Sequence, residues 1–99
     1  MPELPELNPV IHGKLRLALL SLLVGVEEAE FTWLRSKTGA TDGNLGAQLL
    51  KLEEAGYVSV KKKFVQRKPQ TIYRITEAGR EAMAEYVQAL KQMLGGTIG

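Results

Sequence analysis

The 99-residue sequence predicts a mainly α fold with a small β-hairpin (class α+β), in the order helix, helix, helix, strand, strand, helix. Three observations predict this order. Apolar residues recur at helical spacing in four segments, the period changes from 3.6 to 2 between residues 57 and 76, and Gly39 separates two short helical segments. An apolar share of 44% is enough for one small domain over residues 1–99, with an ordered core from about 9 to 94.

The first segments are an extended lead and an apolar helix. Prolines keep residues 1–9 extended, and a helix is expected over residues 10–25. One face of this helix, expected to point inward, carries Ile11, Leu15, Ala18 and Leu22, and roughly the opposite face carries Leu17, Leu20 and Val24. A helix that is apolar on two faces must bury both, so the second face is expected to pack on another subunit.

Two short helices follow, joined by a glycine turn. The first is expected over Thr32–Thr38, with Thr32 as N-cap and with Phe31 and Leu34 as core contacts. After Gly39, a helix over residues 41–55 begins with Thr41 as N-cap and Asp42 in its first turn. Its buried stripe and its terminating glycine are Leu45, Leu49, Leu52 and Gly56.

The chain then alternates as strands do before it returns to a helix. Residues 57–64 and 70–76 are expected to be strands, and residues 65–69 are expected to form a hairpin tip that carries Arg67 and Lys68. Thr76 caps a last helix from Glu77 to about Leu94, and residues 95–99 are expected to be a frayed tail.

The last helix has a broader apolar arc than one small domain needs. The excess favours a homodimer over simple docking of the helix on the sheet, with the spare face of the first helix in the same seam. The expected seam residues are Leu17, Leu20, Val24, Tyr86, Leu90, Met93 and Leu94.

Composition excludes most catalytic and metal chemistry. There is no Cys, which excludes disulfides, thiolate metal sites and a cysteine nucleophile, and the single His12 is best explained as structural. No phosphate-binding loop, dinucleotide fingerprint or nucleophile motif is present, and the row Glu77, Glu81, Glu85 is typical of a solvated face. We therefore expect no enzyme activity, no cofactor and no metal. Trp33 is more typical of packing than of an effector pocket, and the sequence leaves open whether a small-molecule effector exists.

The sequence indicates a cytoplasmic protein that is not inserted in a membrane. Its longest nearly apolar run, residues 17–26, is about half the length that a bilayer-spanning helix needs. Glu3 and Glu6 precede this run and no small-residue cleavage site follows it, which is unlike a signal peptide.

Positive charge is concentrated in the hairpin although the net charge is only +2. Between Ala55 and Thr76 no residue is acidic, and the basic residues are Lys61, Lys62, Lys63, Arg67, Lys68 and Arg74. A segment of one charge sign favours binding of a polyanion. The alternative is a solvated strand edge, which lysines commonly protect from aggregation.

The order of elements is that of a winged helix-turn-helix. A major groove about 12 Å wide admits one helix that shows polar side chains outward. Opposite the leucine stripe, and after Thr41, the 41–55 helix carries Asn44, Ala47, Gln48 and Lys51. Asn and Gln can pair with adenine, Ala can contact a thymine methyl, and Lys can reach guanine or phosphate. The wing, residues 61–70, carries Lys61, Lys63, Arg67 and Lys68 for the flanking backbone or minor groove.

Three stretches resemble a known family: LNPVIHGKLRLALLSLL, TDGNLGAQLLKLEEAGYVSVKKKF and RKPQTIYRITEAGRE. Over about residues 7–94 they are similar to small bacterial and archaeal winged-helix transcriptional regulators of the MarR/ArsR-like group. The resemblance implies a homodimer that binds operator DNA, with Asn44, Gln48 and Lys51 in the major groove and Arg67 and Lys68 on the wing. The cysteine motif of arsenic-type repressors is absent, so thiolate metal sensing is not implied.

Two functions remain open at this point. The first is a sequence-specific, homodimeric DNA-binding transcriptional regulator. The second is a winged-helix module that binds another protein and no specific DNA. The second is favoured by the apolar Leu50 on the outer half of the 41–55 helix, by Gly43 and Gly46, which weaken that helix, and by the small net charge.

Overall fold

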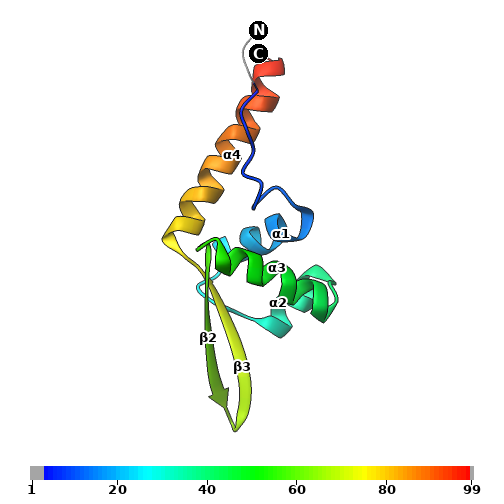
Figure 1. The fold of residues 1–99 in the computed structure, drawn as a ribbon, viewed down its shortest axis with the longest axis vertical. Helices are drawn as coiled ribbons and strands as arrows, with labels where there is room; N and C mark the ends of the chain where they lie inside the picture. Colours follow the sequence, from blue (N-terminus) through cyan, green and yellow to red (C-terminus); the bar gives the residue numbers. More distant parts are fainter. Residues whose placement is uncertain (1–3, 99) are drawn as a thin grey trace.

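The computed structural model describes residues 4–98, with side chains for residues 4–95. Three helices pack beside a three-stranded antiparallel sheet of order β1-β3-β2, and a fourth helix follows. The elements are α1 (Lys14–Val24), β1 (Ala29–Glu30), α2 (Phe31–Thr38), α3 (Asp42–Glu54), β2 (Val58–Val65), β3 (Lys68–Ile75) and α4 (Glu77–Ile98). In Figure 1 the β2–β3 hairpin and α4 extend from the helical body toward opposite ends of the molecule. The predicted α+β winged helix-turn-helix is confirmed, with β1 as an addition.

One apolar core joins α1, α2, α3, the sheet and the first half of α4. Its completely buried large side chains are Ile11, Leu19, Leu20, Leu23, Leu34, Leu45, Leu49 and Leu52. Burying each of these is worth roughly 1.5–3 kcal/mol relative to leaving it exposed. Across residues 4–98, no helix has the length and apolarity that a bilayer crossing requires.

The first helix begins later than predicted and turns a different face inward. The Asn8 side-chain oxygen accepts from the Val10 amide at 2.9 Å, and the Asn8 carbonyl accepts from the Ile11 and His12 amides. This turn and the extended Gly13 delay α1 to Lys14. The buried face of α1 is Leu19, Leu20 and Leu23, whereas the predicted inner residues Leu15, Ala18 and Leu22 are only half-buried.

This change of face corrects the predicted dimer seam. Leu20 is 0% exposed and Tyr86 is 4% exposed, so neither side chain has surface left for a second subunit. Tyr86 instead pairs with His12 inside the protomer, its Oη 3.0 Å from Nδ1. Assigning these two residues to the seam was therefore wrong. The other seam candidates stay accessible: Val24 and Leu94 are exposed, and Leu17, Leu90 and Met93 are half-buried.

The helix-turn-helix follows the predicted pattern closely. Helix α2 begins at Phe31, one residue earlier than expected, with Glu30 rather than Thr32 as its N-cap. Gly39 ends it with a φ of +70°, a left-handed conformation that favours glycine. Thr41 caps α3 as predicted, its hydroxyl accepting from the Asn44 amide at 3.2 Å. The predicted leucine stripe of α3 is buried.

The hairpin is longer and its turn tighter than predicted. Strands β2 and β3 pair from Val58 opposite Ile75 to Val65 opposite Lys68. Only Gln66 and Arg67 connect them, with φ of 50° and 66°, as in the two-residue turns that match strand twist. Lys68 therefore belongs to β3 and not to the tip loop.

Helix α4 begins as predicted and continues past its expected end. The Thr76 hydroxyl accepts from the Gly79 amide at 3.0 Å and caps the helix. The helix then continues to Ile98, so residues 95–98, expected to be frayed, are helical, and Gly99 lies outside the described residues. Its 22 residues span roughly 33 Å, more than half of the 59 Å length of the molecule.

Gly79 and Gly46 give opposite expectations for alanine substitution. A Cβ at Gly79 would lie 2.3 Å from the Tyr57 carbonyl oxygen and 2.8 Å from Ile75 Cγ1. Because this contact is too close, we expect Gly79→Ala to lower the free energy of unfolding by about 1–3 kcal/mol. A Cβ at Gly46, inside α3, would meet nothing within 4 Å, and we expect Gly46→Ala to raise stability by about 0.5–1 kcal/mol. Urea unfolding of both variants measures this, and equal effects would contradict the packing described.

Candidate nucleic-acid interface

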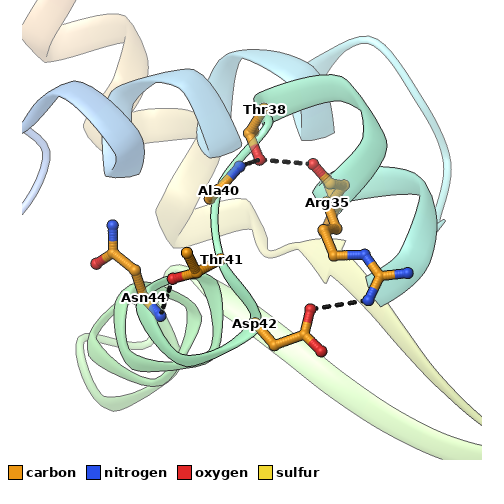
Figure 2. A network of polar contacts seen from close by, with 7 residues as sticks. Arg35, Thr38, Ala40, Thr41, Asp42 and Asn44 are labelled. Atoms are coloured by element: carbon orange, nitrogen blue, oxygen red, sulfur yellow. Dashed lines mark hydrogen bonds and ion pairs between the residues drawn. The ribbon is translucent and has the colours of Figure 1, made fainter.

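Polar contacts hold α2 and α3 at a defined angle across their turn (Figure 2). The Thr38 hydroxyl donates to the Leu34 carbonyl at 2.8 Å and accepts from the Ala40 amide at 3.3 Å. Arg35 and Asp42 form an ion pair of 2.8 Å between the two helices. Both of its side chains are substantially exposed, so the pair contributes at most about 1 kcal/mol and mainly aligns the start of α3.

The predicted base-contacting row runs from the flank of α3, at Gln48 and Asn44, to the outer face opposite the buried stripe, at Ala47. At about 100° per residue, Gln48 is only about 60° from the direction of Leu45, so it is half-buried. Thr41, Asn44, Ala47 and Lys51 are exposed. Farther round the helix, Leu50 is 54% exposed on the outer face, as the sequence suggested.

A side chain that the sequence reasoning missed reaches this row from α1. Arg16 Nη1 donates to Gln48 Oε1 at 2.5 Å, and Gln48 Nε2 donates to Asn44 Oδ1 at 3.1 Å. The three residues lie on the wall of a hollow between α1, the end of α2 and α3. Gln48 and Asn44 are therefore linked to each other, and their polar atoms are not independent.

The two faces of the wing differ in charge environment. Lys61 and Lys63 share one face, as predicted, and Lys62 lies on the other with Phe64, which is 76% exposed. Lys63 lies 3.8 Å from a Glu28 oxygen, and the same carboxylate pairs with Arg74 at 3.1 Å. The Lys61/Lys63 face is thus partly neutralised beside the body.

The hairpin tip, defined as Arg67 in the turn and Lys68 at the start of β3, keeps its full positive charge. Arg67 and Lys68 are exposed, and in the described part of the chain neither has a carboxylate within ion-pair distance. Arg67 occupies the second position of the two-residue turn, so its side chain leaves the hairpin at its far end. A cation at this distance from the body is suited to contact a phosphate chain beside α3.

One titratable side chain of the sheet, Tyr73, is perturbed by its surroundings. Burial raises the pKa of the Tyr73 phenol above its usual value, and the nearby Glu53 carboxylate raises it further. The phenol therefore stays protonated and neutral at physiological pH. Within residues 4–98 no group of three His, Asp or Glu side chains is placed to hold a metal ion.

Comparison with known proteins assigns the family. Residues 15–94 match the family described as the winged helix DNA-binding domain. The chain belongs to this family. An uncharacterized protein of Methanocaldococcus jannaschii is 39% identical to this winged helix domain over 84 residues, which cover 85% of this chain and 91% of that protein.

Solved structures share the same architecture. A transcriptional regulator homologue from Pyrococcus horikoshii is similar with a TM-score of 0.83 at 27% identity, covering 89% of this chain and 87% of that one. Bacillus subtilis PadR, solved in complex with operator DNA, is similar in fold with a TM-score of 0.68 at 19% identity, covering 76% of this chain and 47% of that one. Family membership confirms the predicted DNA-binding transcriptional regulator and favours it over an enzyme or a protein-binding module.

The contacts of Glu28 generate a prediction about DNA affinity. Glu28→Gln removes the carboxylate beside Lys63 and Arg74, so we expect tighter binding to any duplex. The dependence of log affinity on log salt should steepen by up to about 0.9 for each cation released to a phosphate. Fluorescence anisotropy with random duplex at several salt concentrations measures both. Glu81→Gln, the same charge change on exposed α4, is the control, and an equal effect of the two variants would contradict local screening by Glu28.

Proposed function

We propose that this winged helix domain acts in the cytoplasm as a homodimer that binds specific operator DNA, with α3 in the major groove and the wing on the flanking backbone or minor groove. The observation that carries the proposal is the hairpin tip, where Arg67 and Lys68 extend uncompensated charge from the body that holds α3. A polar flank on α3 and a projecting cationic loop can contact the groove and the backbone of the same DNA duplex at two places.

The α3 residues have separate roles in this proposal. Lys51 reaches guanine or a phosphate, Ala47 contacts a thymine methyl, and Thr41 lies at the N-terminal end of the helix, close to the backbone. Asn44 and Gln48 read base edges. The exposure of Asn44, Ala47 and Lys51 supports these roles, and the half-buried Gln48 borders Asn44.

The wing residues supply affinity more than specificity. Arg67 and Lys68 contact phosphates or enter the minor groove, and Lys61 and Lys63 contact the backbone from one strand face. Because Lys63 is also near Glu28, its contribution is smaller than that of the tip residues.

The projecting part of α4 supports dimerisation. Val87 is 41% exposed and Leu94 is 58% exposed on a helix whose second half extends beyond the body (Figure 1). Val24, 41% exposed, and Val87 line the same depression between α1 and α4. A second copy would cover these side chains together with Leu17, Leu90 and Met93. Two-fold symmetry would then present two α3 helices about one turn of DNA apart, roughly 34 Å.

Arg67→Ala tests the role of the wing. We expect weaker binding to all duplex sequences and a salt dependence shallower by about 1, because one phosphate contact is lost. Anisotropy titrations with random and selected duplexes at salt concentrations of about 50 to 200 mM measure the affinity and its salt dependence. Lys14→Ala, which removes an exposed cation at the start of α1, outside the wing and the proposed dimer surface, is the matched control. An unchanged salt dependence for Arg67→Ala would reject the proposed wing contact.

The double substitution Val87→Glu and Leu94→Glu tests the dimer. Both side chains are exposed in the protomer, so the fold should persist while the charged seam separates the subunits. Sedimentation should show a monomer, and affinity for a two-fold symmetric site should fall by at least about tenfold because the two half-sites no longer bind as one unit. Phe64→Glu, an exposed apolar residue of the wing, should remain dimeric. A double variant that stays dimeric would place the interface elsewhere.

A further inference from the structure

Arg16 is held in one orientation by hydrogen bonds from all three nitrogens of its guanidinium group. Nε donates to the Val10 carbonyl, Nη2 donates to the Pro9 carbonyl at 3.4 Å, and Nη1 donates to Gln48 Oε1 at 2.5 Å. The guanidinium lies over Gly13, where an added Cβ would come within 2.9 Å of Nη2. The planar donor fork is therefore fixed between the segment before α1 and the flank of α3.

This fixed donor determines how the two amides of α3 are turned. Arginine has donors and no acceptor, so the Gln48 atom that faces it must be the oxygen. The Gln48 nitrogen then faces Asn44 and donates to Oδ1 at 3.1 Å, which leaves the Asn44 nitrogen on the other side of its amide. Asn44 Nδ2 makes no hydrogen bond with the described residues, and its side chain is exposed.

We propose that Arg16 is a positioning residue that determines base specificity by making Asn44 present its NH2 group, and not its whole amide edge, to the DNA. This inference rests on the proposed placement of α3 in the major groove. Guanine offers two acceptors there, N7 and O6, whereas adenine offers N7 beside the N6 donor. A donor-only group matches guanine and opposes the adenine N6 group. Asn44 thus selects guanine over adenine, contrary to the adenine pairing expected for a free Asn side chain.

A purely structural role for Arg16 would have a different signature. Loss of its contacts to the Val10 and Pro9 carbonyls would lower stability and weaken binding to all sequences alike. A positioning role changes the preference at one base pair while the other positions of the site keep theirs. Base preference is therefore the measurement that separates the two roles.

The decisive variant is Gln48→Glu. The carboxylate still accepts from Arg16 but cannot donate to Asn44, so Asn44 must turn, donate Nδ2 to Glu and expose its oxygen. Selection of bound duplexes from a randomised library gives the preferred site of each variant, and Asn44→Ala identifies the base pair concerned. We expect the unsubstituted protein to prefer guanine over adenine at this pair by about tenfold, and Gln48→Glu to reverse the preference.

Two further variants complete the test. Arg16→Met releases both amides, and we expect the guanine preference at this pair to be lost and to move toward adenine, the base with which a free Asn side chain pairs. Lys14→Met removes the same charge from the same helix, where Lys14 makes no hydrogen bond to α3, and should leave the preference unchanged. If Arg16→Met does not fold, Gln48→Glu still decides, because it keeps the Arg16 contacts.

The outcomes separate this inference from the proposed function. If the unsubstituted protein selects no sequence, specific DNA binding itself is rejected, and the inference fails with it. If the protein selects a site but Gln48→Glu keeps the same base at the Asn44 position, only the role of Arg16 is overturned. A guanine preference that reverses with Gln48→Glu and persists with Lys14→Met supports it.

Discussion

The junction where α3, the wing and α4 meet is the constraint on which the rest of the structure depends. The Thr76 amide donates to the Tyr57 carbonyl at 2.9 Å, and the Thr76 hydroxyl donates to the Gly56 carbonyl at 2.6 Å. The same hydroxyl caps α4, and Gly79 leaves no space for a side chain beside Tyr57. Thr76 therefore joins the end of the helix-turn-helix, the start of β2 and the start of α4. Its contacts hold these three parts in fixed positions relative to one another. The burial of the α3 leucine stripe then sets the rotation of α3 about its own axis.

Charge along the wing varies because acidic residues lie only at its base. Glu27 and Glu28 lie just before β1, beside the inner half of the hairpin, where they pair with Arg74, and Glu28 also approaches Lys63. The tip lies beyond their reach and keeps its cations free. A net charge of +2 therefore understates the local field, which is strongest at the end farthest from the body. This distribution favours contact with a chain of phosphates at the tip over general attraction to anions.

Local signals predicted the elements that local physics controls. The caps at Thr41 and Thr76 and the glycine at Gly39 were identified because capping and left-handed turns depend on one residue and its neighbours. The face of α1 was not, since nearly every residue from 17 to 26 is apolar and periodicity cannot distinguish faces. The two-residue β1 is too short to show a period, and the tight turn at Gln66 lacks the glycine that usually indicates one.

The polar flank of α3 shows why its side chains cannot be interpreted one residue at a time. Asn44 and Gln48 have the same functional group, yet the contact from Arg16, 32 positions before Gln48, gives their amides a single direction. No sequence pattern contains that direction, because it depends on the packing of α1 against α3. Helix α1 also carries Val24 beside α4 at its other end, about 12 Å along the helix axis from Arg16 at 1.5 Å per residue. One helix therefore contacts both the amides of α3 and the depression between α1 and α4.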